Sequence, residues 1–482
     1  MSKCSENRVS TGDRNLDCLI QGGFPRGSLI LLAGNPGVGK TVFGANFICK
    51  GVRDFGETGV YVSLAEDKET FYSNISRHFG INCEKCEKRG MCIFLDYATV
   101  KEEGISAMME SILEEIMKVG AKLLVIDSFT AMAQAFKEPF ESRIILHTIL
   151  GKIVRRMGCT TLLICEVPYG TNIIARGMEE FVADGVIILR ASSLEERLFR
   201  DLEIRKLRGT FIKEREIPFT LRGGFKVIQP FKFEPVEKPS RCKPIPHPPG
   251  RFVTFSPDLN YFLEGGFKSG TTALLEIGDN VSFEQYRFSV ILPIEWNFIS
   301  NGQPLISIPS PGLDYKAIRA NMIESGFTEE ELNRLVRFVE FGYLGQINRE
   351  PYVIGIEGKN MEEDLKTIVD EILRMRREIG KPLMLTLGAN TFITHYGPSS
   401  TIKALNALSA VTRENSSLML VLLKSGFERL GRIVRAMADT HLKIIREHGV
   451  IFLYGIKPRT PLFAVELDVS KGYPIPKLTP VV

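Results

Sequence analysis

The stretch from Gly34 to Thr41 reads GNPGVGKT and carries the residue types that hold phosphate groups. Its glycines let backbone N–H groups turn toward phosphate oxygens, and a helix beginning near Lys40 adds the positive end of its dipole. The ammonium of Lys40 is expected to reach the β- and γ-phosphates of a nucleoside triphosphate, and the hydroxyl of Thr41 to ligate Mg²⁺. The residues expected to bind the nucleotide are Gly34, Asn35, Pro36, Gly37, Val38, Gly39, Lys40 and Thr41.

Three carboxylates follow apolar stretches that read as strands. Asp127 ends KLLVID, where a phosphate-loop enzyme needs a carboxylate near Mg²⁺. Glu66 and Asp67 follow VYVSLA, at the edge where a parallel sheet places its ligand groups, and a carboxylate there can deprotonate a water that attacks the γ-phosphate. Lys40, Glu66 and Asp67 are therefore the predicted catalytic residues. The pattern alone leaves open a capping role for Asp127 and a solvated acidic loop at residues 66 and 67.

The segments that must position these residues are of two alternating kinds, short apolar runs and stretches with helical spacing. SLILLA, GVYVSLA, KLLVID, TTLLICE and GVIILR are short, apolar runs typical of buried strands. Between them, apolar residues such as Met108, Met109, Ile112 and Ile116 recur at helical spacing. This alternation predicts an α/β domain with a mostly parallel sheet and helices on both faces.

The second half of the chain repeats the order of the first. A shift of 243 residues sets Gly266 on Gly23 and aligns GGF and the following LL, and three further blocks follow in the same order. The same shift replaces Lys40 by Phe283 and Thr41 by Glu284, and Asp127 falls on Leu387. A phenylalanine supplies no cation and a glutamate repels phosphate. Residues 274–285 are therefore predicted to fold as a strand, a turn and a helix start that bind no nucleotide.

A proline-rich stretch separates the two copies. Residues 229–250 carry seven prolines and no apolar periodicity, which predicts an extended linker. The expected organisation is an active domain at 1–228, this linker at 229–250, and a second domain at 251–482 that lacks the phosphate-loop and magnesium residues.

Several stretches of the first half resemble the KaiC family of RecA-like ATPases: STGDRNLDCLIQGGFPRGSLILLAGNPGVGKT, SLAED, LLVIDS, GMEEFVADGVIIL and IRKLRGTFIKEREIPFTL. The likeness is strong over about residues 8–228 and weak but collinear over about 250–470. It implies two tandem RecA-like P-loop domains, ATP and Mg²⁺ as cofactors, and a homo-oligomeric ring, usually a hexamer, with ATP at each subunit interface. It also implies that Lys206 and Arg208, in KLRGT, reach the γ-phosphate bound by the neighbouring subunit.

Two positions depart from the clock-protein pattern of that family. The adjacent carboxylates there are Glu-Glu, whereas here they are Glu66 and Asp67. The Ser-Thr pair that is phosphorylated in the second domain of the clock protein falls on Glu180-Phe181 or on Arg435-Ala436. Without a hydroxyl at these places, autokinase activity is the less favoured interpretation.

Composition limits which other kinds of protein this chain can be. The net charge of +4 neither suggests nor excludes nucleic acid, and no apolar run is long enough to cross a membrane. The N-terminus lacks an apolar signal core, so a cytoplasmic location is expected. The nine cysteines are expected to be reduced thiols. Cys83, Cys86 and Cys92 follow His78 and are interpreted either as a metal or redox site or as incidental cysteines of a loop.

These observations favour a ring-forming ATPase whose second domain serves as a structural or partner-binding pseudo-ATPase for an unidentified protein. Two alternatives stay open: a DNA-handling recombinase or helicase of the same superfamily, and a regulator of transcription or signalling that binds its partner in an ATP-dependent way. The stretches SFTAMAQAFKEPFESR and VPYGTNIIARGMEE, where DNA contacts are sought, are mixed in charge.

Overall fold

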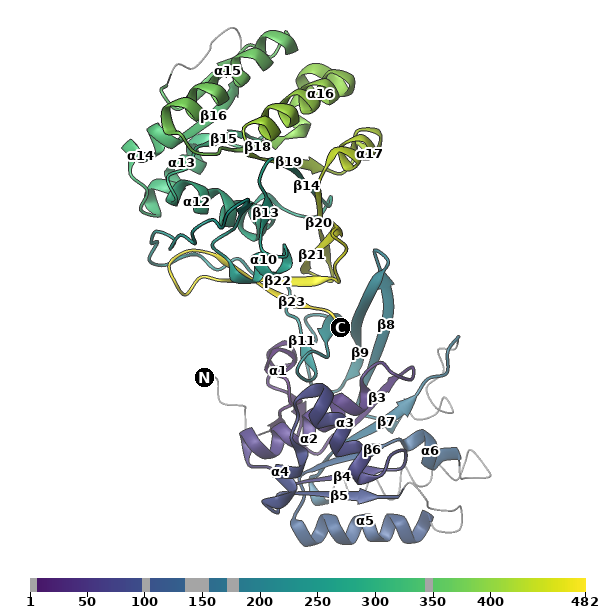
Figure 1. Cartoon of the computed structure of the whole chain (residues 1–482). Helices are drawn as coiled ribbons and strands as arrows, with labels where there is room; N and C mark the ends of the chain where they lie inside the picture. Colours follow the sequence, from purple (N-terminus) through teal and green to yellow (C-terminus); the bar gives the residue numbers. More distant parts are fainter. Residues whose placement is uncertain (1–6, 98–104, 135–155, 171–181, 343–349) are drawn as a thin grey trace. The chain divides into compact units, whose positions relative to one another are not determined.

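A computed structural model of the chain describes residues 7–97, 105–134, 156–170, 182–342 and 350–482 (Figure 1). The chain divides into two compact units. The first comprises Met1–Gln229 together with Pro480–Val482, and the second comprises Pro230–Thr479. In the described residues, no helix is both long and apolar enough to cross a membrane.

The first unit is built on a nine-stranded sheet. Its strands, in spatial order, are β11 (Lys226–Val227), β10 (Glu216–Thr220), β9 (Arg197–Leu207), β8 (Gly185–Leu194), β3 (Leu29–Gly34), β7 (Thr160–Glu166), β6 (Leu123–Asp127), β4 (Gly59–Ser63) and β5 (Cys92–Asp96). The run from β8 to β5 is parallel, and β9, β10 and β11 continue the sheet in antiparallel pairing.

Helices cover both faces of this sheet because its central strands are apolar on both sides. In β3, Ile30 and Leu32 join the core under one set of helices, whereas Leu29 and Leu31 join the core on the other face. The first set comprises α1 (Arg14–Leu19), α2 (Lys40–Phe55), α3 (Lys68–Phe79) and α4 (Cys83–Lys88). The opposite face carries α5 (Ile105–Val119) and α6 (Phe129–Gln134).

The second unit is built on a ten-stranded sheet with the same plan. Its strands, in spatial order, are β17 (Val353–Ile356), β16 (Val336–Phe341), β15 (Leu305–Ile308), β18 (Met384–Gly388), β19 (Leu418–Lys424), β14 (Thr271–Ile277), β20 (Thr440–Glu447), β21 (Val450–Lys457), β22 (Phe463–Asp468) and β23 (Ile475–Pro480). Counted from β3 or from β14, both sheets place the same succession of strands on each side, and β17 is an addition at one edge.

Helices also cover both faces of the second sheet. One core lies under α10 (Pro257–Phe262), α11 (Phe283–Tyr286), the π-helix η3 (Arg287–Ile291), α12 (Leu292–Ser300), α13 (Tyr315–Glu324) and α14 (Glu329–Leu335). The other lies under α15 (Met361–Ile379), α16 (Ala389–Glu414) and α17 (Glu428–Met437). The predicted fold class, a mostly parallel sheet between helices in each of two units, is confirmed.

Small details repeat between the units as well. A two-stranded pair of β1 (Arg8–Val9) and β2 (Phe24–Pro25) precedes the first sheet, and β12 (Arg251–Phe252) with β13 (Phe267–Lys268) precedes the second. Gly23 and Gly266 both have positive φ, and a Cβ on either would meet a backbone oxygen within 2.4 Å. The aligned GGF frames therefore mark the same tight crossing of two backbone segments.

The proline-rich segment 229–250 contains no helix or strand, and it is held against the second unit. The Asn297 amide accepts from the backbone N–H of Ile245 at 2.8 Å and donates to its carbonyl oxygen at 3.0 Å. The backbone N–H of Ser240 donates to the carbonyl oxygen of Gly472 at 2.9 Å. These contacts make the segment part of the packing of the second unit along much of its length.

Candidate nucleotide site

The strand register gathers the predicted site residues at one edge of the first sheet. Gly34, at the end of β3, pairs with Glu166 of β7. Asp127, at the end of β6, pairs with Ser63 of β4 on one side and Ile164 of β7 on the other. Because carboxyl ends of parallel strands meet at a common edge, the loops that follow β3, β4, β6 and β7 face one another there.

The loop between β3 and α2 has the backbone of a phosphate cradle. Gly37 and Gly39 have φ of 77° and 107°, in the left-handed region that favours glycine. Gly34 packs so closely that a Cβ would lie 2.6 Å from the carbonyl oxygen of Leu189. Lys40 is 7% exposed, and its ammonium donates to the carbonyl oxygens of Gly34 and Asn35, each at 2.9 Å. Burial lowers the pKa of Lys40.

Thr41 and Asp127 are in direct contact. The Thr41 hydroxyl donates to Oδ2 of Asp127 at 2.7 Å, and the Tyr61 hydroxyl donates to the same oxygen at 2.8 Å. Burial raises the pKa of Asp127; its hydrogen bonds and the Lys40 charge oppose this rise, and the Glu66 charge adds to it. Tyr61 thus fixes the orientation of the carboxylate, which lies beside the first turn of α2.

The two adjacent acidic residues have different surroundings. Asp67 is the N-cap of α3: its carboxylate accepts from the Thr70 backbone N–H at 2.9 Å and from the Thr70 hydroxyl at 2.7 Å. These two hydrogen bonds lower the pKa of Asp67. Glu66 is half-buried, its backbone is tied to the Ser63 hydroxyl, and its Oε2 lies 3.5 Å from the Asn74 amide nitrogen. The Glu66 side chain is therefore better suited to general-base chemistry, because Asp67 already caps a helix.

The residues expected to act on a neighbouring subunit contact the first unit of their own chain. The Lys206 ammonium, on β9, donates to the carbonyl oxygen of Ala183 at 2.6 Å. Arg208, just beyond β9, lies 3.4 Å from Oδ1 of Asp184 and its side chain is 57% exposed. The Arg208 guanidinium is thus the more accessible of the two cations.

Three residues near the phosphate loop were not predicted. Arg200, on β9, donates to the carbonyl oxygens of Gly37 and Val38 at 3.4 and 3.2 Å, and its Nε donates to the carbonyl oxygen of Val482 at 3.1 Å. Tyr61 orients Asp127 as described. Glu166 ends β7 and its charge acts on Lys40. Only Glu166 carried a usable sequence signal, because it ends a strand as Asp127 does.

The arrangement fits ATP and Mg²⁺. The glycine-containing loop can turn backbone N–H groups toward phosphate, the Lys40 ammonium supplies a positive charge, and Thr41 and Asp127 supply the oxygens that Mg²⁺ prefers. No rearrangement of the strands is needed to bring these groups together.

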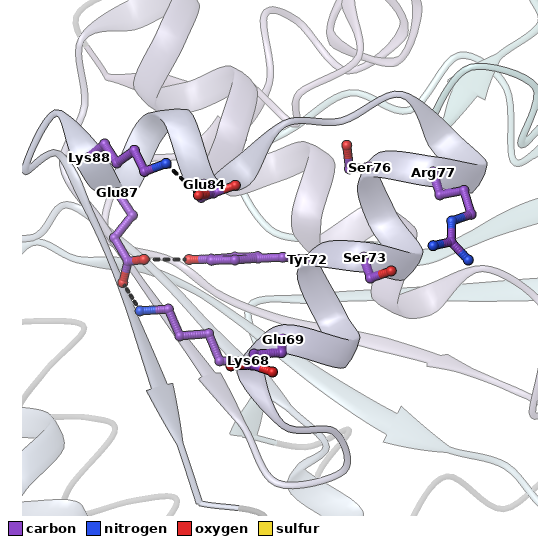
Figure 2. Close-up of a pocket in the computed structure, with 9 residues that line it drawn as sticks. All are labelled: Lys68, Glu69, Tyr72, Ser73, Ser76, Arg77, Glu84, Glu87 and Lys88. Carbon is purple, nitrogen blue, oxygen red and sulfur yellow. Dashed lines mark hydrogen bonds and ion pairs between the residues drawn. The ribbon is translucent and has the colours of Figure 1, made fainter.

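A separate hollow of about 780 Å³ lies between α3 and α4. Figure 2 shows Lys68 and Tyr72 converging on Glu87, with Nζ–Oε1 and OH–Oε2 distances of 2.7 and 3.1 Å. Lys88 and Glu84 form a second ion pair at 2.5 Å. The hollow is lined by equal numbers of cationic and acidic side chains, so it has no excess charge with which to hold phosphate.

The cysteine cluster beside this hollow is not arranged as a metal site. Cys83, in α4, forms a disulfide with Cys49 of α2, so the expectation of reduced thiols is wrong for this pair. Cys86 and Cys92 are buried free thiols, and burial raises the pKa of Cys92 to about 12. In the part of the chain that the structure describes, no group of three or more His, Cys, Asp or Glu residues is placed to hold a metal ion.

The corresponding place in the second unit keeps the strand and the helix start but has different side chains. β14 ends at Ile277 and α11 begins at Phe283, which confirms the predicted strand, turn and helix start. Ser282 is the N-cap and forms a capping box with Gln285. The expectation that Leu387 takes the place of Asp127 is wrong by one residue: Gly388 ends β18 and pairs with Leu422 as Asp127 pairs with Ile164, whereas Leu387 is buried on the opposite face of the sheet.

Of the two positions considered for an autokinase acceptor, residues 180 and 181 lie outside the described residues. Arg435, in α17, forms an ion pair with Glu276 of β14. Much of the two stretches in which DNA contacts were sought also lies outside the described residues.

The chain is similar in sequence to proteins of one known family. The family model described as "ATPase: KaiC" matches residues 9–231. The circadian clock oscillator protein KaiC of Parasynechococcus marenigrum is 34% identical over 223 residues, which cover 44% of this chain and 43% of that protein. Its counterpart in Prochlorococcus marinus (strain SARG) is 26% identical over 453 residues, which cover 92% of this chain and 81% of that protein.

A solved structure of a KaiC-like protein from Pyrococcus horikoshii is 37% identical, covers 46% of this chain and 99% of its own, and has a TM-score of 0.42. This chain spans about half the length of the curated relatives that it matches first: 43% of one and 52% of another.

Proposed function

Through residues 9–231 this chain belongs to the KaiC family of ATPases, and we propose that the first unit binds ATP with Mg²⁺ and hydrolyses it. The observation that carries the proposal is the meeting of Lys40, Thr41 and Asp127 at one edge of the sheet, with Thr41 and Asp127 hydrogen-bonded at 2.7 Å. ATP supplies the phosphoryl group and Mg²⁺ supplies charge that stabilises the departing diphosphate.

The side chains take distinct parts in this reaction. Lys40 holds positive charge at the phosphates, and the hydroxyl of Thr41 would ligate Mg²⁺ while Asp127 orients that hydroxyl. Glu66 takes the proton from the attacking water. Asp67 caps α3, the helix that directly follows Glu66, and so helps to position Glu66.

We further propose that the chain assembles into a homo-oligomeric ring, most simply a hexamer, as the family resemblance implies. Arg208 would then reach the ATP bound by the neighbouring subunit, with Lys206 beside it. The second unit would act through contacts with an unidentified protein partner, because the positions of Lys40, Thr41 and Asp127 hold Phe283, Glu284 and Gly388 there.

The direct test is ATP turnover by the purified full chain. Lys40→Ala is expected to lower turnover by at least about 10²-fold, because one preorganised positive charge on the phosphates is lost. The matched control is Glu284→Ala, at the position of Thr41 in the second unit, which should leave turnover unchanged. Full turnover in Lys40→Ala would refute the assignment of the loop. Particle imaging with ATP would test the ring separately.

A further inference from the structure

A second cavity, of about 330 Å³, lies in the first unit at the far end of α2 from the phosphate loop. Its walls come from three segments: residues 10–15, the last turns of α2, and Lys226 of β11. α2 rises roughly 22 Å between Lys40 and Phe55, so a nucleotide at the phosphate loop cannot also fill this cavity.

The charge lining this cavity is unbalanced, unlike that of the hollow between α3 and α4. Four cationic side chains face two carboxylates. Asp54 is already bound by Arg53 through Nε and Nη2, at 2.7 and 3.2 Å. Asp13 is 6% exposed and accepts from the backbone N–H of Leu16 as the N-cap of α1.

The other three cations make no direct ion pair in the part of the chain that the structure describes, although the charges of Arg14 and Lys50 act on Asp54 without direct contact. In the described residues, Arg14, Lys50 and Lys226 form no ion pair within 4.0 Å and no side-chain hydrogen bond. Lys50 is half-buried, and burial lowers its pKa; the charges of Asp13 and Asp54 oppose this fall, whereas those of Arg53 and Lys226 add to it. Like charges that line one small cavity raise the free energy of the folded state unless an anion joins them.

Helix stabilisation explains only one of the four cations. Arg53 lies in the last turn of α2, where a positive charge favours the helix dipole. Arg14 is the first residue of α1, where the dipole disfavours a cation, and Lys226 belongs to a strand. Their presence in one cavity with Lys50 needs another explanation.

The cavity walls are firmly built. The Asn46 amide, on α2, donates to the carbonyl oxygens of Gly12 and Phe225, at 2.9 and 3.2 Å. A Cβ on Gly12 would lie 2.6 Å from the carbonyl oxygen of Asn46, so the segment before α1 rests directly on the α2 backbone. The backbone segments that carry the cations are therefore fixed before any ligand binds, which limits the entropy lost on binding.

We propose that this cavity binds a small phosphorylated molecule that carries a planar ring, the chemistry of a nucleoside monophosphate. Its phosphate would lie among Lys50, Lys226 and Arg14, which can donate charge-assisted hydrogen bonds. Its ring would lie against Phe55, which lines the cavity and is 47% exposed. The cavity volume falls at the lower end of those that hold small ligands. This site is independent of the proposed ATPase activity.

Ligand binding is measured by titration calorimetry, with the Lys40→Ala variant as the parent protein and every further substitution added to it. Binding at the phosphate loop is then weakened equally in all the proteins compared. The probes are AMP, inorganic phosphate and uncharged adenosine. AMP is expected to bind, to bind more weakly as salt increases, and to lose at least about tenfold in affinity with Lys50→Gln or with Lys226→Gln. Lys226 is exposed, so its variant keeps the test meaningful if Lys50→Gln fails to fold.

Two further variants separate the parts of the ligand. Phe55→Ala should weaken AMP and leave inorganic phosphate unchanged, and Arg222→Gln, an exposed cation that does not line the cavity, should change neither. Absence of AMP binding in the Lys40→Ala background would overturn the proposal. So would equal AMP affinity in the parent and the Lys226→Gln variant, or adenosine binding as tightly as AMP.

Discussion

The phosphate loop of the first unit and its counterpart in the second unit share a strand, a turn and a helix start but have opposite backbone requirements. Gly39 precedes α2 with φ of 107°, whereas Ser282 precedes α11 with φ of −74°. The first conformation needs glycine and leaves the loop amides for a ligand. The second suits an ordinary N-cap residue, whose hydroxyl satisfies a helix N–H internally. In the second loop a serine side chain therefore caps the helix start, at the place where the first loop leaves its amides uncapped by any side chain.

A different pair of positions has kept its contacts in both units. Asp184 accepts from the backbone N–H of Leu29 at 3.1 Å, and Asp439 accepts from that of Thr272 at 3.0 Å. Lys206 donates to the carbonyl oxygen of Ala183, and Lys457 to that of Ala438. The second unit keeps this lysine contact although it lacks the residues expected to bind a nucleotide. The contact is therefore structural in that unit. Of the two cations proposed to reach ATP on a neighbouring subunit, Arg208 is therefore the stronger candidate.

The largest expected effect comes from Glu66, which has no acidic counterpart at the corresponding Pro309–Pro311 of the second unit. Glu66→Gln removes the proposed base and should lower ATP turnover by about 10²–10⁴-fold while ATP binding stays near that of the parent. Turnover and equilibrium binding of a fluorescent ATP analogue would be measured together.

Asp67→Asn provides the control, because asparagine also caps a helix. Turnover in this variant should stay close to that of the parent. A loss as large as that of Glu66→Gln would mean that the Asp67 carboxylate, and not only its cap, acts in the reaction.

The second prediction concerns the disulfide that ties α2 to α4 in the first unit. Cys49 and Cys83 are 34 residues apart, and a closed loop of that size stabilises a fold by about 3–4 kcal/mol. Cys49→Ser should lower the free energy of unfolding of the first unit by about that amount in denaturant titrations without reductant. Cys18→Ser, at an exposed free thiol, should have little effect. Equal stability of the parent with and without reductant would contradict the prediction.

The sequence predicted the parts of the site that obey local rules. Gly37, Gly39, Lys40 and Thr41 follow from the phosphate-loop spacing, and Asp127 follows from its place at the end of an apolar strand. These choices depend on backbone conformation and strand polarity, which neighbouring residues determine. The same logic predicted the fold class, because short apolar runs alternate along the chain with stretches of helical spacing.

Residues that meet only through tertiary packing escaped prediction. Arg200 reaches the phosphate loop from a distant strand, and Cys49 pairs with Cys83 across two helices. No local pattern marks either contact. For Asp67 the sequence left two roles open, because an acidic residue at a helix start fits both an N-cap and a base; its hydrogen bonds show the cap, and its catalytic part stays a prediction.

The third prediction tests Arg200, which holds the outside of the phosphate loop. Arg200→Ala removes hydrogen bonds to the carbonyl oxygens of Gly37 and Val38 and should loosen the loop at a cost of about 1 kcal/mol. The Michaelis constant for ATP should rise about fivefold with little change in the maximal rate. Arg222→Ala, at an exposed position with no side-chain hydrogen bond in the described residues, is the control. A fall in the maximal rate alone would place Arg200 in the chemical step.

The smallest expected effect probes the second loop directly. Ser282→Ala removes the hydroxyl that accepts from the Gln285 backbone N–H, at 3.4 Å, and should lower the stability of the second unit by roughly 0.5–1 kcal/mol. ATP turnover should not change. Ser282→Gly should cost only a few tenths of a kcal/mol, because glycine is itself a tolerated N-cap. If the glycine variant gained ATP binding in the second unit, the loss of nucleotide chemistry there would rest on this one position. We expect no gain, because Phe283 and Glu284 still supply neither the cation nor the hydroxyl.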